Sequence, residues 1–96
     1  MSAEAEARAE ATLMEHLNPM QQVMWQREGA FEVAGAHVSK TFAGIRVVQN
    51  QRKFYMAPRY VDFPCADVAL SAKLLLEGDP LNWQLAAHLC GMVWLQ

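Results

Sequence analysis

The chain has 96 residues, which is enough for one domain spanning 1–96 around a single small core. It is 53% hydrophobic with a formal net charge of −2, a globular composition that excludes a disordered or collagen-like chain. No stretch reaches the ~18 apolar residues that a membrane span needs, and the alternating Ala–Glu start is unlike a signal peptide, so we expect a cytoplasmic protein without membrane contact.

Charge is unevenly distributed along the chain. Residues 1–17 carry four glutamates against one arginine, and residues 61–96 carry four acidic side chains against one lysine. Residues 37–60, which directly precede the second acidic region, include no acidic residue. A basic middle therefore lies between acidic flanks, and its cations are Lys40, Arg46, Arg52, Lys53 and Arg59.

Two helices are predicted before residue 30. Residues 3–17 are strong helix formers, but their large apolar side chains come only at the end, so we expect 1–12 either to fray or to extend as a solvated helix. Asn18-Pro19 then supplies a cap and a first-turn proline, and Gln21 stands at the capping-box position. Gly29 is the expected end of this second helix.

From Ala30 the pattern changes to the alternation of a strand. Strands are predicted at 31–33 and 38–42, and a β-hairpin at 45–56 with a polar tip at 49–52. Gly44 indicates a turn or bulge. These segments predict an antiparallel sheet of three or four strands.

A central helix is predicted over 63–80, and we expect it to be the most buried element. Asp62 is the expected cap, Pro64 fits the first turn, and Gly78 fits the end. At 100° per residue its apolar side chains fall on two stripes. The broad stripe holds Val68, Ala69, Ala72, Leu75 and Leu76, and the second holds Leu70 and Leu74.

A final helix is predicted to start at Asp79-Pro80 and to run nearly to the end of the chain. Its expected inward face holds Leu81, Leu85, Ala86, Leu89, Met92 and Val93. The other side is also apolar, and a helix apolar nearly all round is either buried in a large protein or shared with a partner. We therefore predict a protein interface formed by Trp83, Ala87, Cys90, Gly91 and Trp94. The alternative is that Trp83 and Trp94 cover the sheet edge or the N-terminal helices as ordinary core residues.

Together these elements predict an α+β domain. It has two N-terminal helices, a small antiparallel sheet, and two C-terminal helices packed on the sheet.

Two motifs occur in fixed order along 26–79. The first is the strand motif Phe-x-Val-x-Gly at 31–35, and the second is a helix motif that begins at Pro64 after an intervening Pro58. The helix motif comprises Pro64, Asp67, Val68, Leu70, Lys73, Leu74, Leu76 and Glu77. The order resembles a small uncharacterised domain of many hypothetical bacterial and phage proteins. The strand section is shorter here and lacks that family's Gly-x-x-Tyr-x-Ile run. The resemblance implies the order of elements and transfers no site, because no activity is attached to the domain.

An enzyme is not expected. Cys65 falls in the first turn of the predicted central helix, where a thiolate is favoured, but all three histidines are distant in sequence and free cysteines are commonly buried. The two cysteines and three histidines show no metal-ligand spacing. We expect free thiols, a packing role for Cys65, and neither cofactor nor metal.

The basic stretch gives an alternative function. Lys40, Arg46, Arg52, Lys53, Tyr55, Arg59 and Tyr60 combine cations with aromatic rings, which suits single-stranded nucleic acid or an acidic partner. Cations on strands also prevent edge-to-edge aggregation, and the sequence pI of 5.8 is low for a nucleic-acid-binding domain. The favoured hypothesis is a non-enzymatic protein–protein interaction module, a homodimer through the final helix. A phage-encoded or mobile-element-encoded inhibitor of a host defence or nucleic-acid machine is an extension of it.

Overall fold

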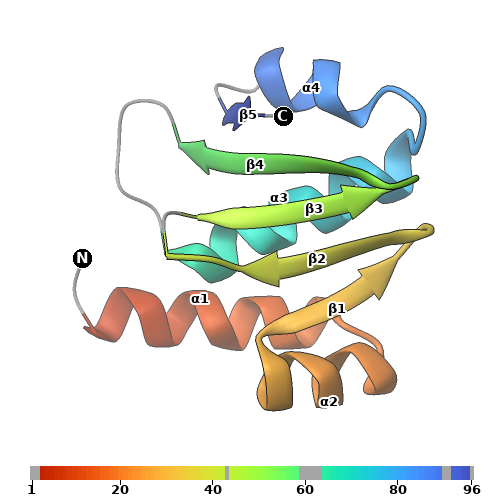
Figure 1. Cartoon of the computed structure of the whole chain (residues 1–96). Coiled ribbons are helices and arrows are strands. Elements are labelled where there is room, and N and C mark those ends of the chain that lie inside the picture. Colours follow the sequence, from red (N-terminus) through yellow and green to blue (C-terminus); the bar gives the residue numbers. More distant parts are fainter. Residues whose placement is uncertain (1–2, 43, 59–63, 90–91, 96) are drawn as a thin grey trace.

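The computed structural model describes residues 3–42, 44–58, 64–89 and 92–95, with side chains except at 58 and 92–95 (Figure 1). The predicted α+β fold and its order of helices are confirmed. The helices are α1 (Ala3–His16), α2 (Pro19–Glu28), α3 (Cys65–Gly78) and α4 (Trp83–Leu89). The strands are β1 (Ala30–Val33), β2 (Ala36–Lys40), β3 (Ile45–Gln49), β4 (Arg52–Pro58) and β5 (Met92–Leu95).

The strands form one antiparallel sheet in the order β1-β2-β3-β4-β5, so each described strand pairs with its neighbour in the chain. Its inner face is built on a row of side chains in register across four strands: Phe31, Val38, Val47 and Phe54. All four are at most 1% exposed. In Figure 1, α3 lies behind the sheet, and none of the drawn helices covers the near face.

Local sequence explains the turns that connect these elements. Asn18 accepts a hydrogen bond from the backbone N–H of Gln21, and the Gln21 side chain accepts one from Asn18, which is the predicted capping box. Gly29 ends α2 in the left-handed conformation. Asn50 and Gln51 both have positive φ, as the two-residue turn of a tight hairpin requires.

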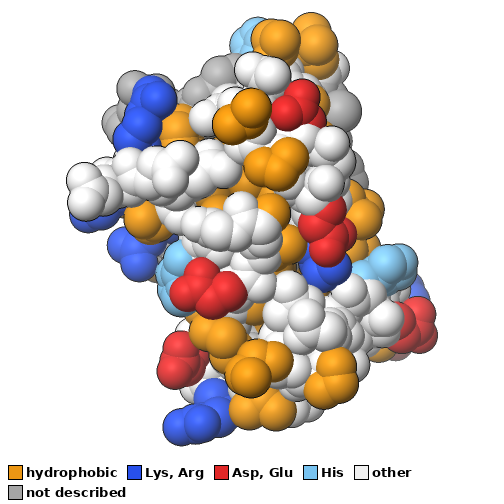
Figure 2. Space-filling model, turned by 90° about the vertical axis from the view of Figure 1, so that its right-hand side faces the viewer, with side chains coloured by type: hydrophobic (Ala, Val, Ile, Leu, Met, Phe, Trp, Pro, Cys, Tyr) orange, Lys and Arg blue, Asp and Glu red, His pale blue; other side chains and the backbone are white. Residues whose placement is uncertain are grey.

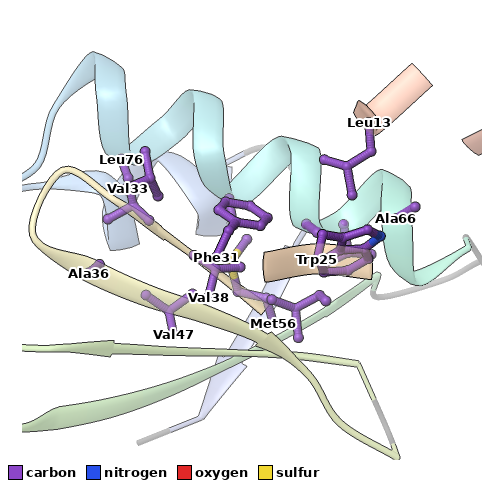
Figure 3. Packing of buried hydrophobic residues seen from close by; sticks show 14 of the residues in the cluster. Leu13, Trp25, Phe31, Val33, Ala36, Val38, Val47, Met56, Ala66 and Leu76 are labelled. Atoms are coloured by element: carbon purple, nitrogen blue, oxygen red, sulfur yellow. The ribbon is translucent and has the colours of Figure 1, made fainter. Parts of the chain in front are cut away.

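The core lies between the sheet and a layer formed by α1 and α3. Figure 3 shows Phe31 and Val38 between the strands and α3, with Leu76 toward one end of the core and Leu13 and Trp25 toward the other. Helix α1, which covers most of the stretch where fraying or a solvated helix is expected, packs along α3. Its buried side chains are Ala9 and Leu13.

Helix α3 follows the predicted pattern with differences at its ends. Val68, Ala69, Ala72 and Leu76 are buried as predicted, whereas Leu75 is only half-buried. Leu74, on the second stripe, is 53% exposed. The capping residue is Pro64, which makes no side-chain cap bond, and the predicted cap Asp62 lies outside the described residues.

The end of the chain corrects the prediction of one long final helix. Helix α4 stops at Leu89, and residues 92–95 form β5, which pairs with β4. The predicted three or four strands therefore become five in the described part of the chain. The reason is that Met92-Val-Trp-Leu95 offers β-branched and aromatic residues to an edge of β4 that would otherwise lack a backbone partner.

Candidate functional site

The start of α4 is fixed by the predicted Asp79-Pro80 pair. The Asp79 carboxylate accepts hydrogen bonds from the backbone N–H groups of Leu81 at 3.2 Å and Asn82 at 3.1 Å. These N–H groups precede the first full turn and would otherwise lack partners. The turn therefore sets where the α4 side chains point.

Trp83 anchors α4 to the sheet. Its indole is fully buried and meets the Phe54 ring edge-on, with 5.1 Å between ring centroids and 81° between planes. The indole N–H donates to Gln49 Oε1 at 2.8 Å, and Gln49 Nε2 donates to the Pro80 carbonyl at the same distance. Ala87, one turn after Trp83, is also fully buried.

The predicted interface at the end of the chain is therefore wrong for two residues. Trp83 and Ala87 pack inside the protomer and leave no surface for a partner. Cys90 and Gly91 lie outside the described residues. Trp94 lies in β5 opposite Met56, and only its backbone is described.

The opposite side of α4 is exposed. Leu81, Leu85 and Leu89 are 83%, 60% and 76% exposed, and we call them the leucine surface. Leu85 and Leu89 are one turn apart and so share a face of α4. The helical pattern of the sequence predicted all three on the inward face of the final helix, and this prediction is wrong. The physical reason is that both sides of α4 are apolar. The side that packs on the sheet is the one whose indole N–H finds a hydrogen-bond acceptor there, the Gln49 side chain.

Other exposed apolar side chains occur elsewhere. Met20 and Val23 on α2 are 72% and 51% exposed, and Phe42, after β2, is fully exposed. In Figure 2 the hydrophobic side chains on this side of the molecule are interspersed with charged and polar ones. Among the described residues, the leucine surface combines three large apolar side chains within one short segment.

The described side chains of the predicted basic stretch lie on two different faces of the sheet. Arg46 and Tyr55 are cross-strand partners on the outer face, and Lys53 projects to the same side. We call this side the open sheet face and define it by Arg46, Lys53 and Tyr55, with Glu32, His37, Ser39 and Val48 beside them.

The other two described cations turn toward the core side. Lys40 Nζ lies 3.2 Å from Glu10 Oε1 and 4.8 Å from the centre of the Trp25 ring. The Trp25 indole N–H also donates to Glu10, at 2.6 Å, so Glu10 links α1, α2 and β2. Arg52 lies over the Phe54 ring at 5.3 Å. Arg59 and Tyr60 lie outside the described residues.

The open sheet face contains polar atoms without partners. Ser39 is 7% exposed, and neither its Oγ nor the Nε of its cross-strand partner Arg46 has a hydrogen-bond partner. Glu32 and His37 instead pair with each other at 3.1 Å. Unpaired buried polar groups are rare in folded proteins because each loses its hydration without compensation.

Cys65 lies half-buried at the first turn of α3 and carries a free thiol. It lines a cavity of about 400 Å³ between the N-terminal ends of α1 and α3, together with Glu10 and Lys40. No histidine is among the described residues lining this cavity, and the Glu10 carboxylate is already engaged by Trp25 and Lys40. The Glu6 carboxylate also lines the cavity and forms none of the described ion pairs or side-chain hydrogen bonds, so the acidic side chain available near the thiol is a glutamate.

No group of three or more His, Cys, Asp or Glu side chains within the described residues could hold a metal ion. None of the helices in the described ranges is both long enough and apolar enough to cross a membrane.

Comparison of the chain with models of protein families, with curated proteins and with solved structures finds no match.

Proposed function

We propose that this chain is a non-enzymatic protein–protein interaction module that self-associates through the leucine surface. The observation that carries the proposal is the exposure of Leu81, Leu85 and Leu89 within one short segment of a small chain. Covering a leucine side chain fully contributes about 1.5–3 kcal/mol, so an exposed group of three favours association. The contact element remains α4, but the contact lies on its leucine side rather than on the side of Trp83.

The low charge of the segment that carries the leucine surface supports a second copy as the partner. From 79 to 89 the only Asp, Glu, Lys or Arg is Asp79, and the polar residues are Asn82, Gln84 and His88. A segment with many charges of one sign would repel an identical copy, whereas this segment has a single charged residue of those four types. In a twofold dimer each patch meets itself, so Leu85 and Leu89 of one α4 would pack against the same residues of the other.

The test is the molar mass in solution, measured by multi-angle light scattering over a range of concentrations. The parent chain should approach the mass of two 10.8 kDa copies as the concentration rises. The double variant Leu85→Gln/Leu89→Gln should stay monomeric, because it replaces the apolar patch with good helix formers that are polar.

The matched control is Met20→Gln/Val23→Gln, which removes two exposed apolar side chains from α2. It should leave the dimer intact. A parent chain that is monomeric at every concentration would refute self-association, and a control that dissociates the dimer as completely as the α4 variant would move the interface to α2. The expected inhibitor role would use the leucine surface on a target protein instead of a second copy.

A further inference from the structure

We propose that the open sheet face binds single-stranded nucleic acid, with Arg46 and Lys53 contacting phosphates and Tyr55 stacking on a base. This site shares no residue with the leucine surface. The geometry that supports it is a sheet that the described helices cover on one side only. Helices α1 and α3 pack on the inner side, and the row of Ser39, Arg46 and Tyr55 faces away from them.

The central contact is a cation and an aromatic ring held side by side. Arg46 and Tyr55 are directly opposite each other on β3 and β4, which brings their Cβ atoms within about 5.5 Å. Lys53 lies two residues from Tyr55 on the same side of β4. Tyr55 is 37% exposed, so part of its ring is available to stack on a base. Arg46 and Lys53 would then contact the phosphates of the nucleic-acid backbone.

The charge of Arg46 is uncompensated. None of the three ion pairs in the described part of the structure includes Arg46 or Lys53. Glu32, the acidic residue of this face, is held by His37. The Nε of Arg46 and the Oγ of Ser39 also lack hydrogen-bond partners, so turning the Arg46 side chain toward a phosphate costs no existing polar contact.

The acidic residues that lower the pI lie on other elements. Helix α1 carries Glu4, Glu6, Glu10 and Glu15, and α3 carries Asp67 and Glu77, all in the layer behind the sheet. Of the four Lys or Arg on the described strands, Arg46 and Lys53 lie on the outer face, against Glu32. A net charge of −2 for the whole chain is therefore compatible with a basic outer face.

The lack of an apolar centre favours nucleic acid over an acidic protein. Protein interfaces have an apolar core, and on β1 to β4, the strands whose side chains are described, the exposed large hydrophobic side chains are limited to Tyr55. The others are on α2, α3, the segment after β2, and the region of α4. A face with two free cations, one partly exposed ring and little aliphatic surface matches a ligand that offers phosphates and flat bases.

The test is fluorescence anisotropy of the full chain with a labelled oligothymidylate of roughly 16 nucleotides, a length that covers the usual single-strand sites. Affinity should fall steeply with salt because bound phosphates release counterions. Arg46→Ala should weaken binding and reduce the slope of log K against log salt by about 0.7, the value for one phosphate contact on a single strand. Arg46→Lys keeps the charge and should retain most of the slope.

Arg8→Ala is the matched control, because it removes the same charge from the exposed side of α1 in the other layer. It should leave the slope unchanged. Tyr55→Ala should weaken binding by at least about fivefold, whereas Tyr55→Phe, which keeps the ring, should bind like the parent. Circular dichroism of each variant establishes that the sheet is intact.

Three results would overturn the proposal. The first is no binding to oligothymidylate at low salt by the folded parent chain. The second is an equal loss from Arg8→Ala and Arg46→Ala, which would mean that only net charge matters. The third is polyglutamate binding as tight as oligothymidylate binding with no dependence on Tyr55, which would assign the face to an acidic protein partner.

Discussion

Both sides of α4 are apolar, but one packs inside the protomer and the other faces outward. Trp83 and Ala87 are fully buried, while Leu85 and Leu89, displaced by two residues on the same helix, are 60% and 76% exposed. The difference lies in the partners that each side finds. Trp83 meets Phe54 and donates its indole N–H to Gln49, whereas a leucine side has no polar group that would fix its orientation. Specific pairing, more than apolar area, decides which side faces inward.

The comparison also separates stability from association. Side chains on the buried side contribute to the folding free energy of one protomer. Side chains on the exposed side contribute little until another surface covers them. Substitutions on the buried side should therefore change the unfolding free energy of the protomer, and substitutions on the exposed side should change its self-association.

The largest effect is expected from Trp83→Ala. Removing a buried aromatic side chain costs about 3–5 kcal/mol of unfolding free energy, since it leaves a cavity beside Phe54 and deprives Gln49 of its donor. Urea denaturation followed by circular dichroism measures this change. Trp83→Phe keeps an aromatic ring and should cost less. A loss below about 1 kcal/mol in Trp83→Ala would show that the indole does not anchor α4.

An intermediate effect is expected from Ala87→Leu. Ala87 is fully buried, so the added atoms must displace neighbours at a cost of about 1–3 kcal/mol. Ala86→Leu is the matched control, because Ala86 is only half-buried and can direct the larger side chain outward. Thermal and urea unfolding of the pair give the comparison. Equal losses from both substitutions would mean that the buried side of α4 is not tightly packed.

The smallest effect on protomer stability is expected from Leu85→Gln. At concentrations where the chain is monomeric, its unfolding free energy should stay within about 0.5 kcal/mol of the parent value, as for other surface substitutions. The same variant should weaken self-association, which sedimentation at higher concentration detects. A large loss of stability in the monomer would place Leu85 in the core and remove the distinction between the two sides.

Much of the fold could be predicted because its signals are local. The Asn18–Gln21 capping box, the left-handed Gly29 and the alternation around Phe31 and Phe54 each act within a few residues. The fifth strand could not be predicted in the same way, since β5 depends on the free edge of β4, which precedes it by more than thirty residues. Gly91 before Met92-Val-Trp-Leu95 was the available signal, because glycine commonly ends a helix and the following residues favour a strand.

The candidate sites were predicted less well than the fold. The alternation of a strand places Lys53 and Tyr55 on the outer side, and the same rule places Arg52 on the inner side with Phe54. Treating the basic stretch as one patch overlooked this division. For α4 the helical pattern offered two apolar sides with no local feature to choose between them. The choice depended on Gln49, 34 residues earlier, whose side chain accepts the indole N–H.

The packing of α1 on α3 has a consequence for the order in which the chain folds. The strands from β1 to β4 follow one another directly and can pair as a meander with short loops. Helix α1 instead packs against α3, and residues 17–64 separate the two helices in the chain. Forming this contact closes a long loop and costs conformational entropy before Leu13 is buried. The first helix of the chain is thus expected to dock late in folding and to detach early in partial unfolding, while the meander remains paired.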